Sequence, residues 1–229
     1  MDVEKEYERT RRELLTGIGI AAAGVAMAPA VAAQGNGDSQ SPRRYELDAW
    51  LDRPDVHHRT FIDTSRPLGG VEAVHYANNI LRGHTTAYGG EESDYAIVVC
   101  FRRFATPLGW GDAIWEKYGQ IFNGVLNYPD PATGQAFTAN PLNQADRRDL
   151  PNRGATIEAL GERGVRYAVC DGATRVISGL LARATDGDAD AVYKELAGSL
   201  VPNARLVPVG VLTVGRAQEY GYSLLYAGL

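Results

Sequence analysis

Residues 164–175 of this chain read GVRYAVCDGATR, an apolar stretch that runs through a turn into a second patterned segment. The apolar residues 165–170 predict a β-strand, and the pair Asp171-Gly172 predicts a tight turn. Residues 173–184 then predict a helix. A strand that turns directly into a helix is the building unit of an α/β fold, so this stretch decides the fold class.

The rest of the chain continues this alternation of strand and helix. Residues 95–101, YAIVVCF, are continuously apolar, and a strand without polar alternation is usually covered on both faces, as in a parallel sheet. Strands are predicted at 59–62, 95–101, 165–170, 207–214 and 222–226, and helices at 71–88, 112–120, 156–163, 173–184, 188–200 and 216–220. The pattern predicts an α/β fold in three layers, an α/β/α sandwich with a mostly parallel sheet.

The first 33 residues have the features of a twin-arginine signal peptide. Arg11 and Arg12 precede a mildly apolar, Ala-rich run at 18–31, and adjacent arginines in that place are the address read by the twin-arginine export route. Small side chains at the end of the run predict cleavage after residue 32 or 33. A membrane anchor is the alternative, but about 14 apolar residues fall short of the roughly 20 that span a bilayer. We therefore expect an exported protein that acts in the periplasm or another extracytoplasmic space.

Composition narrows what the exported part can be. Without the first 33 of its 229 residues, the chain keeps 196 residues and a net charge of −4, because the removed part carries four of the 23 basic and five of the 28 acidic residues. A mildly acidic chain without a basic cluster is unlike a nucleic-acid-binding protein. Residues 34–44 predict a disordered tether and 45–229 a single compact domain, in which no segment is suited to crossing a membrane.

One long segment, 123–154, has no clear helical or strand period and is crowded with Pro, Asn, Asp and Gly. A loop of that length inside a compact domain is usually functional or disordered. Three interpretations are open for it: a lid, a contact between subunits, and a mobile insertion without a further role.

The chain has two cysteines, Cys100 and Cys170, which are too few for a disulfide scaffold. Cys170 ends a predicted strand just before a helix, where unpaired N–H groups and the helix dipole favour a thiolate. Arg175 would add to this effect and Asp171 would oppose it. A nucleophilic thiol is therefore one interpretation of Cys170, and a small buried apolar residue is the other. Cys100 is expected in the core, with a single disulfide to Cys170 as a minor alternative.

Further candidates for a binding site follow the 95–101 strand. Arg102, Arg103 and Thr106 should lie at the same sheet end as Cys170 if the strands are parallel, and arginine there could hold an anionic sulfur species such as thiosulfate. Ordinary surface arginine is the alternative. On the 71–88 helix, His75 beside Asn78 could face the strand ends, or it could cap or pack. The four histidines show no metal-ligand spacing, and we expect no metal and no cofactor.

The stretch 164–175 is similar to the strand, cysteine and helix start of DsrE/DsrF-like sulfur-relay proteins. The C-terminal segments VPVGV at 207–211 and RAQEYGY at 216–222 resemble the penultimate strand, short helix and last strand of the same superfamily. The resemblance covers about residues 57–228 and is closest to its exported members with twin-arginine signals. It implies a five-stranded α/β domain that assembles into homo-oligomers, with Cys170 as the residue that carries a persulfide. The 123–154 segment is no part of the minimal family core, and the relay partners of the familiar members are cytoplasmic.

Two functions follow as expectations. The first is an exported sulfur or persulfide carrier that acts through Cys170, with a sulfur-donor or acceptor protein or a small anionic sulfur species as its partner. The second is a non-catalytic ligand-binding or scaffold domain of a homo-oligomer, which does not need a reactive thiol. Exposure of the Cys170 sulfur to a pocket at the strand ends distinguishes the two.

Overall fold

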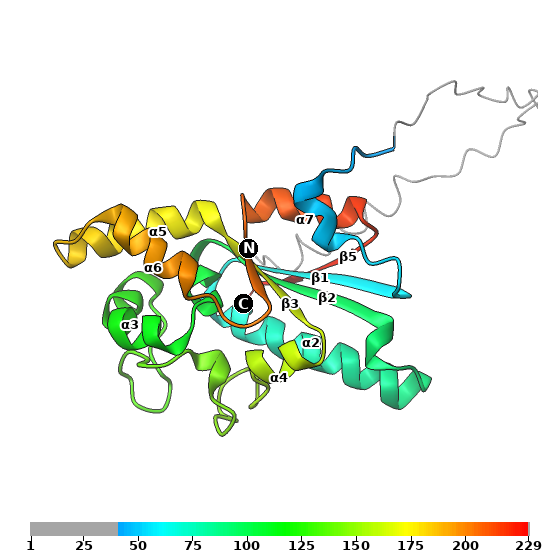
Figure 1. Cartoon of the computed structure of the whole chain (residues 1–229). Coiled ribbons are helices and arrows are strands. Elements are labelled where there is room, and N and C mark those ends of the chain that lie inside the picture. The colour runs from blue at the N-terminus through cyan, green and yellow to red at the C-terminus, as the bar shows by residue number, and fades with distance from the viewer. Residues whose placement is uncertain (1–40, 229) are drawn as a thin grey trace, which may run out of the picture. The chain divides into compact units, whose positions relative to one another are not determined.

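The fold is organised around a five-stranded sheet in which all neighbouring strands are parallel, as a computed structural model of residues 41–228 shows (Figure 1). The strand order is β4-β3-β2-β1-β5. The strands are β1 (His58–Thr64), β2 (Tyr95–Phe101), β3 (Arg166–Cys170), β4 (Ala204–Val207) and β5 (Ser223–Ala227). The α/β class and the five-stranded parallel sheet expected from the sequence are confirmed.

Helices cover both faces of this sheet. The α-helices are α2 (Pro67–Tyr88), α3 (Asp112–Leu126), α4 (Ile157–Glu162), α5 (Asp171–Ala184), α6 (Ala189–Gly198) and α7 (Gly210–Glu219). Short 3-10 helices are η1 (Glu46–Leu51), η2 (Glu92–Asp94), η3 (Arg103–Gly109) and η4 (Pro141–Asn143). In Figure 1, α7 and α2 lie on opposite sides of the strands.

Alternate residues of the central strands separate two apolar cores. Ile97 and Val99 of β2 belong to the larger core, which they share with α2 to α6, whereas Val98 and Cys100 face the smaller core under η1 and α7. All four side chains are almost completely buried. A strand that is apolar at every position therefore reflects cover on both faces, as its sequence predicted.

The prediction of a strand at 207–214 is wrong. β4 ends at Val207, and α7 begins three residues later at Gly210, so the helix predicted at 216–220 is only its last part. Pro208 has no N–H to donate to a sheet ladder, which ends the strand there. Val211 and Leu212 are 60% and 52% exposed, so the apolar pattern of this stretch belongs to a helix surface and not to a buried strand.

The long segment predicted from 123 begins later in the structure, because α3 continues to Leu126. The connection between α3 and α4 packs into the larger core through Phe137, Leu142 and Leu150. The buried Asn140 side chain donates hydrogen bonds to the carbonyl oxygens of Leu108 and Trp110, at 2.9 and 2.8 Å. The backbone N–H of Asn140 also donates to the Asp112 carboxylate at the start of α3, so contacts to η3 and α3 hold the connection although it has almost no regular secondary structure.

The N-terminal part of the chain, up to residue 40, is outside the residues that the structure describes. The predicted signal peptide at 1–33, with Arg11 and Arg12, and most of the predicted tether at 34–44 lie outside the described residues. The first regular element in the described part is η1, which begins at Glu46. In residues 41–228, no helix combines the length and the apolar character that crossing a membrane requires.

A pair of glycines in α3 tests how closely the α3–α4 connection packs. A Cβ atom on Gly119 would overlap the carbonyl oxygen of Phe137, whereas a Cβ on Gly124 would meet nothing within 4 Å. We expect Gly119→Ala to lower the free energy of unfolding by about 1–3 kcal/mol through overpacking. Gly124→Ala, the matched control, should raise it by up to about 1 kcal/mol because alanine favours the helix. Urea denaturation measures both, and equal effects of the two substitutions would contradict the packing described.

Candidate functional site

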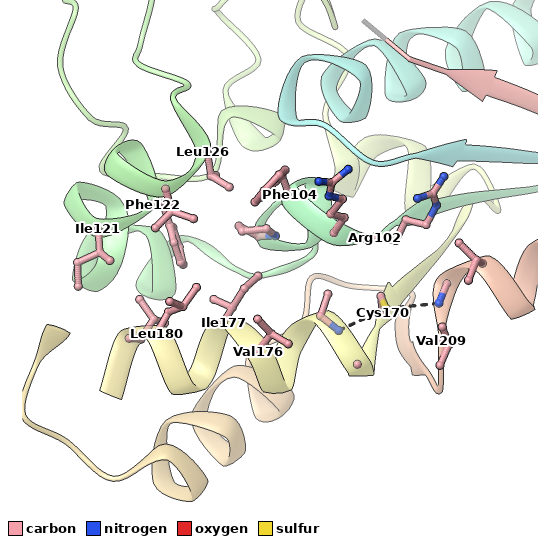
Figure 2. A pocket seen from close by; sticks show the side chains of 18 residues that line it. Arg102, Phe104, Ile121, Phe122, Leu126, Cys170, Val176, Ile177, Leu180 and Val209 are labelled. Carbon is pink, nitrogen blue, oxygen red and sulfur yellow. Dashed lines mark hydrogen bonds between the residues drawn. The ribbon is translucent and has the colours of Figure 1, made fainter. Parts of the chain in front are cut away.

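Cys170 lies where β3 passes into α5, and its sulfur meets the beginnings of two helices. The Sγ atom accepts hydrogen bonds from the backbone N–H of Ala173 in α5 and from that of Gly210 in α7, both at 3.4 Å (Figure 2). Cys170 is itself the N-cap residue of α5. Unpaired N–H groups and the positive ends of two helix dipoles favour a negative charge on this sulfur.

The order of the strands explains why two helices meet there. β4 pairs with β3 in parallel, with Val207 opposite Cys170, so the chain that leaves β4 reaches α7 beside the Cys170 sulfur. The carbonyl oxygen of Pro208 accepts a hydrogen bond from the N–H of Gly172 at 3.2 Å, which joins the two turns. A Cβ atom on Gly210 would lie 2.7 Å from the Cβ of Arg102, so only glycine allows this close approach.

Cys170 borders a cavity of about 370 Å³ between α3 and α5. α3 contributes Ile121, Phe122, Val125 and Leu126, and α5 contributes Val176, Ile177, Leu180 and Leu181. Figure 2 shows these two groups facing one another, with Cys170 at one end of the row. Cys170 is 6% exposed and is one of the residues that line this cavity.

Two arginines lie at the cysteine end of the cavity. Arg102 forms a two-pronged ion pair with Asp63 of β1, with N to O distances of 2.8 and 2.7 Å. Hydrogen bonding to this carboxylate raises the pKa of the Arg102 guanidinium. Arg103 has a left-handed backbone with φ of 54° and places its guanidinium 4.8 Å from the ring centre of Phe104. Within residues 41–228 Arg103 forms no ion pair, and it is one of the residues that line the cavity.

Cys100 occupies a different environment on the neighbouring strand. It is fully buried in the smaller core, and burial, followed by the charge of Asp63, raises the pKa of its thiol well above the ordinary value. Both cysteines are free thiols, so the disulfide considered as a minor alternative is not formed. The core position expected for Cys100 is what the structure has.

The remaining predicted site residues are not brought to the cavity. Thr106 is completely buried and its hydroxyl has no hydrogen-bond partner in the described residues, but it does not line the cavity. Arg175 turns outward, with a 60% exposed side chain that pairs with Asp171 at 2.9 Å and donates to the Tyr193 hydroxyl at 3.0 Å. Pairing with Arg175 also holds the Asp171 carboxylate, which the sequence placed as a neighbour opposing the thiolate.

Asn78 lies at the opposite end of the sheet. Its side-chain oxygen accepts a hydrogen bond from Arg163, 2.7 Å away, and Arg163 also pairs with Glu92. Arg163 and Glu92 precede β3 and β2, so they mark the amino ends of these strands. His75 bonds to Asn79 on the same helix. In the described residues, no group of His, Cys, Asp and Glu side chains comes together in a way that could hold a metal ion.

The sequence analysis did not predict the α3 wall of the cavity. The last turn of α3 was assigned to the long irregular segment because Asn123 and Gly124 interrupt the apolar pattern. A signal was nevertheless present, since Ile121 and Val125, like Phe122 and Leu126, are four residues apart and share a helix face.

Selective labelling tests this description of the two thiols. We expect methyl methanethiosulfonate to modify Cys170 in the folded protein and Cys100 only after unfolding, because Cys100 is sealed and its raised pKa keeps it protonated at neutral pH. Intact-mass and peptide mass spectrometry count the adducts. Cys100→Ser should keep the single native adduct and Cys170→Ser should lose it. Equal labelling of both thiols in the native state would contradict the geometry.

Comparison with known proteins gives no further information about this site. No protein-family model matches the sequence, and no curated protein is similar to it. The similarity of residues 164–175 to the DsrE/DsrF-like superfamily therefore stays an expectation from the sequence.

Proposed function

We propose that this protein is an exported, DsrE-like sulfur carrier that holds a persulfide on Cys170. The observation that carries the proposal is the pair of helix N-terminal N–H groups on the Cys170 sulfur, at the edge of a cavity large enough for a ligand. The alternative for Cys170 is a small buried apolar residue without access to a ligand. Both cysteines are buried, but Cys100 is fully enclosed in the smaller core, whereas Cys170 lines the cavity. The predicted twin-arginine signal places the proposed activity outside the cytoplasm.

The transfer step follows ordinary thiol chemistry. The Cys170 thiolate attacks the outer sulfur of a donor persulfide, R–S–S–H. A new S–S bond forms to Cys170, the donor S–S bond breaks, and the donor leaves as the thiolate R–S⁻. The proton stays on the transferred sulfur, and there is no net oxidation or reduction. Attack by an acceptor thiolate on the same outer sulfur reverses the step and passes the sulfur on.

The protein groups around Cys170 suit both stages of this step. Before transfer, the N–H groups of Ala173 and Gly210 stabilise the attacking thiolate. After transfer, the outer sulfur of the persulfide lies about 2 Å from Sγ. Arg103 lines the same cavity and has no carboxylate partner in the described residues, so its charge suits an anionic sulfur donor or acceptor.

Mass spectrometry after exposure to sodium tetrasulfide tests the carrier function. We expect the folded protein to gain sulfur atoms on Cys170 and to lose them to dithiothreitol, because the N–H groups favour the attacking thiolate. Cys100→Ser should behave like the unsubstituted protein, and Cys170→Ser should gain no sulfur. Absence of any sulfur adduct on Cys170 would reject the carrier function and leave the non-catalytic binding domain as the assignment.

We also propose that the chain self-associates, and β5 is the edge that favours this. Leu224, Leu225 and Tyr226 are 44%, 37% and 53% exposed, so the strand is open on both faces and carries no charge. The other edge strand, β4, is short and carries Arg205, which are features that discourage strand pairing. Antiparallel pairing of two copies of β5 about a twofold axis would extend the sheet and cover these side chains.

Light scattering coupled to size-exclusion chromatography tests the assembly. We expect a dimer or larger oligomer, and Leu225→Lys should shift it toward the monomer because lysine on an edge strand opposes strand pairing and the two copies would bring like charges onto neighbouring strands. Leu47→Lys is the matched control, since Leu47 is 62% exposed on η1 and should leave the oligomer intact. A monomeric unsubstituted protein at tens of micromolar concentration would reject self-association.

A further inference from the structure

We infer that the sulfur compound bound at Cys170 is amphipathic, with one anionic sulfur-containing head and an apolar tail of several carbon atoms. This inference rests on the proposed carrier function, because it names the class of compound that the same site serves. In this arrangement the head lies at Cys170 and Arg103, which both line the cavity. The tail lies between α3 and α5, whose labelled side chains face one another in Figure 2.

The first observation is the division of the cavity into two chemically different parts. At one end are Cys170 and the side chains of Arg102 and Arg103. Beyond them, the walls from α3 and α5 consist of aliphatic and aromatic side chains, among them Ile121, Phe122 and Leu180. In the residues that line the cavity, the two arginines are the only charged side chains. A ligand that matches both parts has a charge at one end and hydrocarbon at the other.

The second observation is the size of the cavity. Its volume of about 370 Å³ equals that of roughly a dozen water molecules at about 30 Å³ each. A sulfide or thiosulfate ion would fill a small part of this space and leave water against apolar walls. A tail of several CH₂ groups would displace that water, and each buried CH₂ tightens binding about fourfold.

The third observation is the supply of positive charge. Arg102 is already neutralised by its two hydrogen bonds to Asp63, whose side chain is 7% exposed. Arg103 therefore supplies one unmatched charge, which suits one anionic group better than a doubly charged inorganic ion. Its left-handed backbone, with φ of 54°, is uncommon for a residue other than glycine, and in the described residues four other non-glycine residues share it.

Binding by a chain-length series tests the inference without relying on the thiol. The ligands are methyl, butyl and octyl thiosulfate esters, R–S–SO₃⁻, with inorganic thiosulfate for comparison, titrated calorimetrically into Cys170→Ser. We expect at least a 100-fold increase in affinity from methyl to octyl, and no measurable binding of inorganic thiosulfate. Equal affinity along the series, or tighter binding of inorganic thiosulfate, would overturn the inference in favour of a small inorganic ion.

Two substitutions separate the tail contact from the head contact. Val125→Asp, on the α3 wall and 40% exposed, should weaken octyl thiosulfate at least tenfold, whereas Leu212→Asp, which is 52% exposed and does not line the cavity, should have no effect. Arg103→Gln should weaken all the esters by a similar factor and keep the chain-length dependence. Circular dichroism checks that each variant is folded. Equal effects of Val125→Asp and Leu212→Asp on the binding of octyl thiosulfate would count against a tail between α3 and α5.

Reaction of the unsubstituted protein with alkyl methanethiosulfonates gives a second readout. The Cys170 thiolate attacks the sulfur of R–S–SO₂CH₃, a Cys170–S–S–R bond forms, and methanesulfinate leaves. We expect the rate to rise from methyl to octyl, relative to glutathione with the same reagents. Length-dependent binding without any persulfide on Cys170 would leave the amphipathic ligand in place and reject the carrier. A persulfide on Cys170 without length-dependent binding would support the carrier and reject the amphipathic ligand.

Discussion

Parallel pairing of β3 with β2 on one side and β4 on the other is the constraint on which the site depends. Because all three strands end at the same edge of the sheet, Arg102, Cys170 and Gly210 follow their strands into one small region. An antiparallel neighbour would have sent one of these groups to the far edge. Parallel order also points the N-termini of α5 and α7 at the same sulfur. The positive potential at Cys170 therefore comes from the backbone and from the order of the strands.

Local signals in the sequence were sufficient for four of the five strands and for the position of Cys170 at a strand end. The continuous apolar runs at 95–101 and 165–170, and the turn at Asp171-Gly172, specify their conformation within a few residues, so periodicity identifies them. The position of Arg103 near Cys170 followed from parallel strands alone. The prediction of a strand at 207–214 was wrong because the apolar sequence Val-Pro-Val-Gly-Val-Leu is compatible with both a strand and an exposed helix surface. Periodicity does not distinguish these two structures in so short a stretch.

Side-chain direction and non-local packing were out of reach of the sequence. Arg175 follows Cys170 by five residues, but its pairing with Asp171 and Tyr193 turns it away from the cavity. Asn78 was placed by proximity to His75, whereas its partner Arg163 lies 85 residues away in the chain. Asn140 is a similar case, since its contacts with Leu108 and Trp110 join parts of the chain that no local pattern relates. These contacts hold the connection after α3 against η3, the element that carries Arg103 and Phe104.

The burial of Cys100 has a consequence for how the proposed carrier must exchange its cargo. Many thiol enzymes pair an attacking cysteine with a second, resolving cysteine that releases the bound group within the same chain. This chain has two cysteines, and the one beside Cys170 is sealed in the smaller core as a protonated thiol. In the proposed carrier, sulfur on Cys170 has no second accessible cysteine of the same chain to move to, so turnover depends on an acceptor from outside the chain.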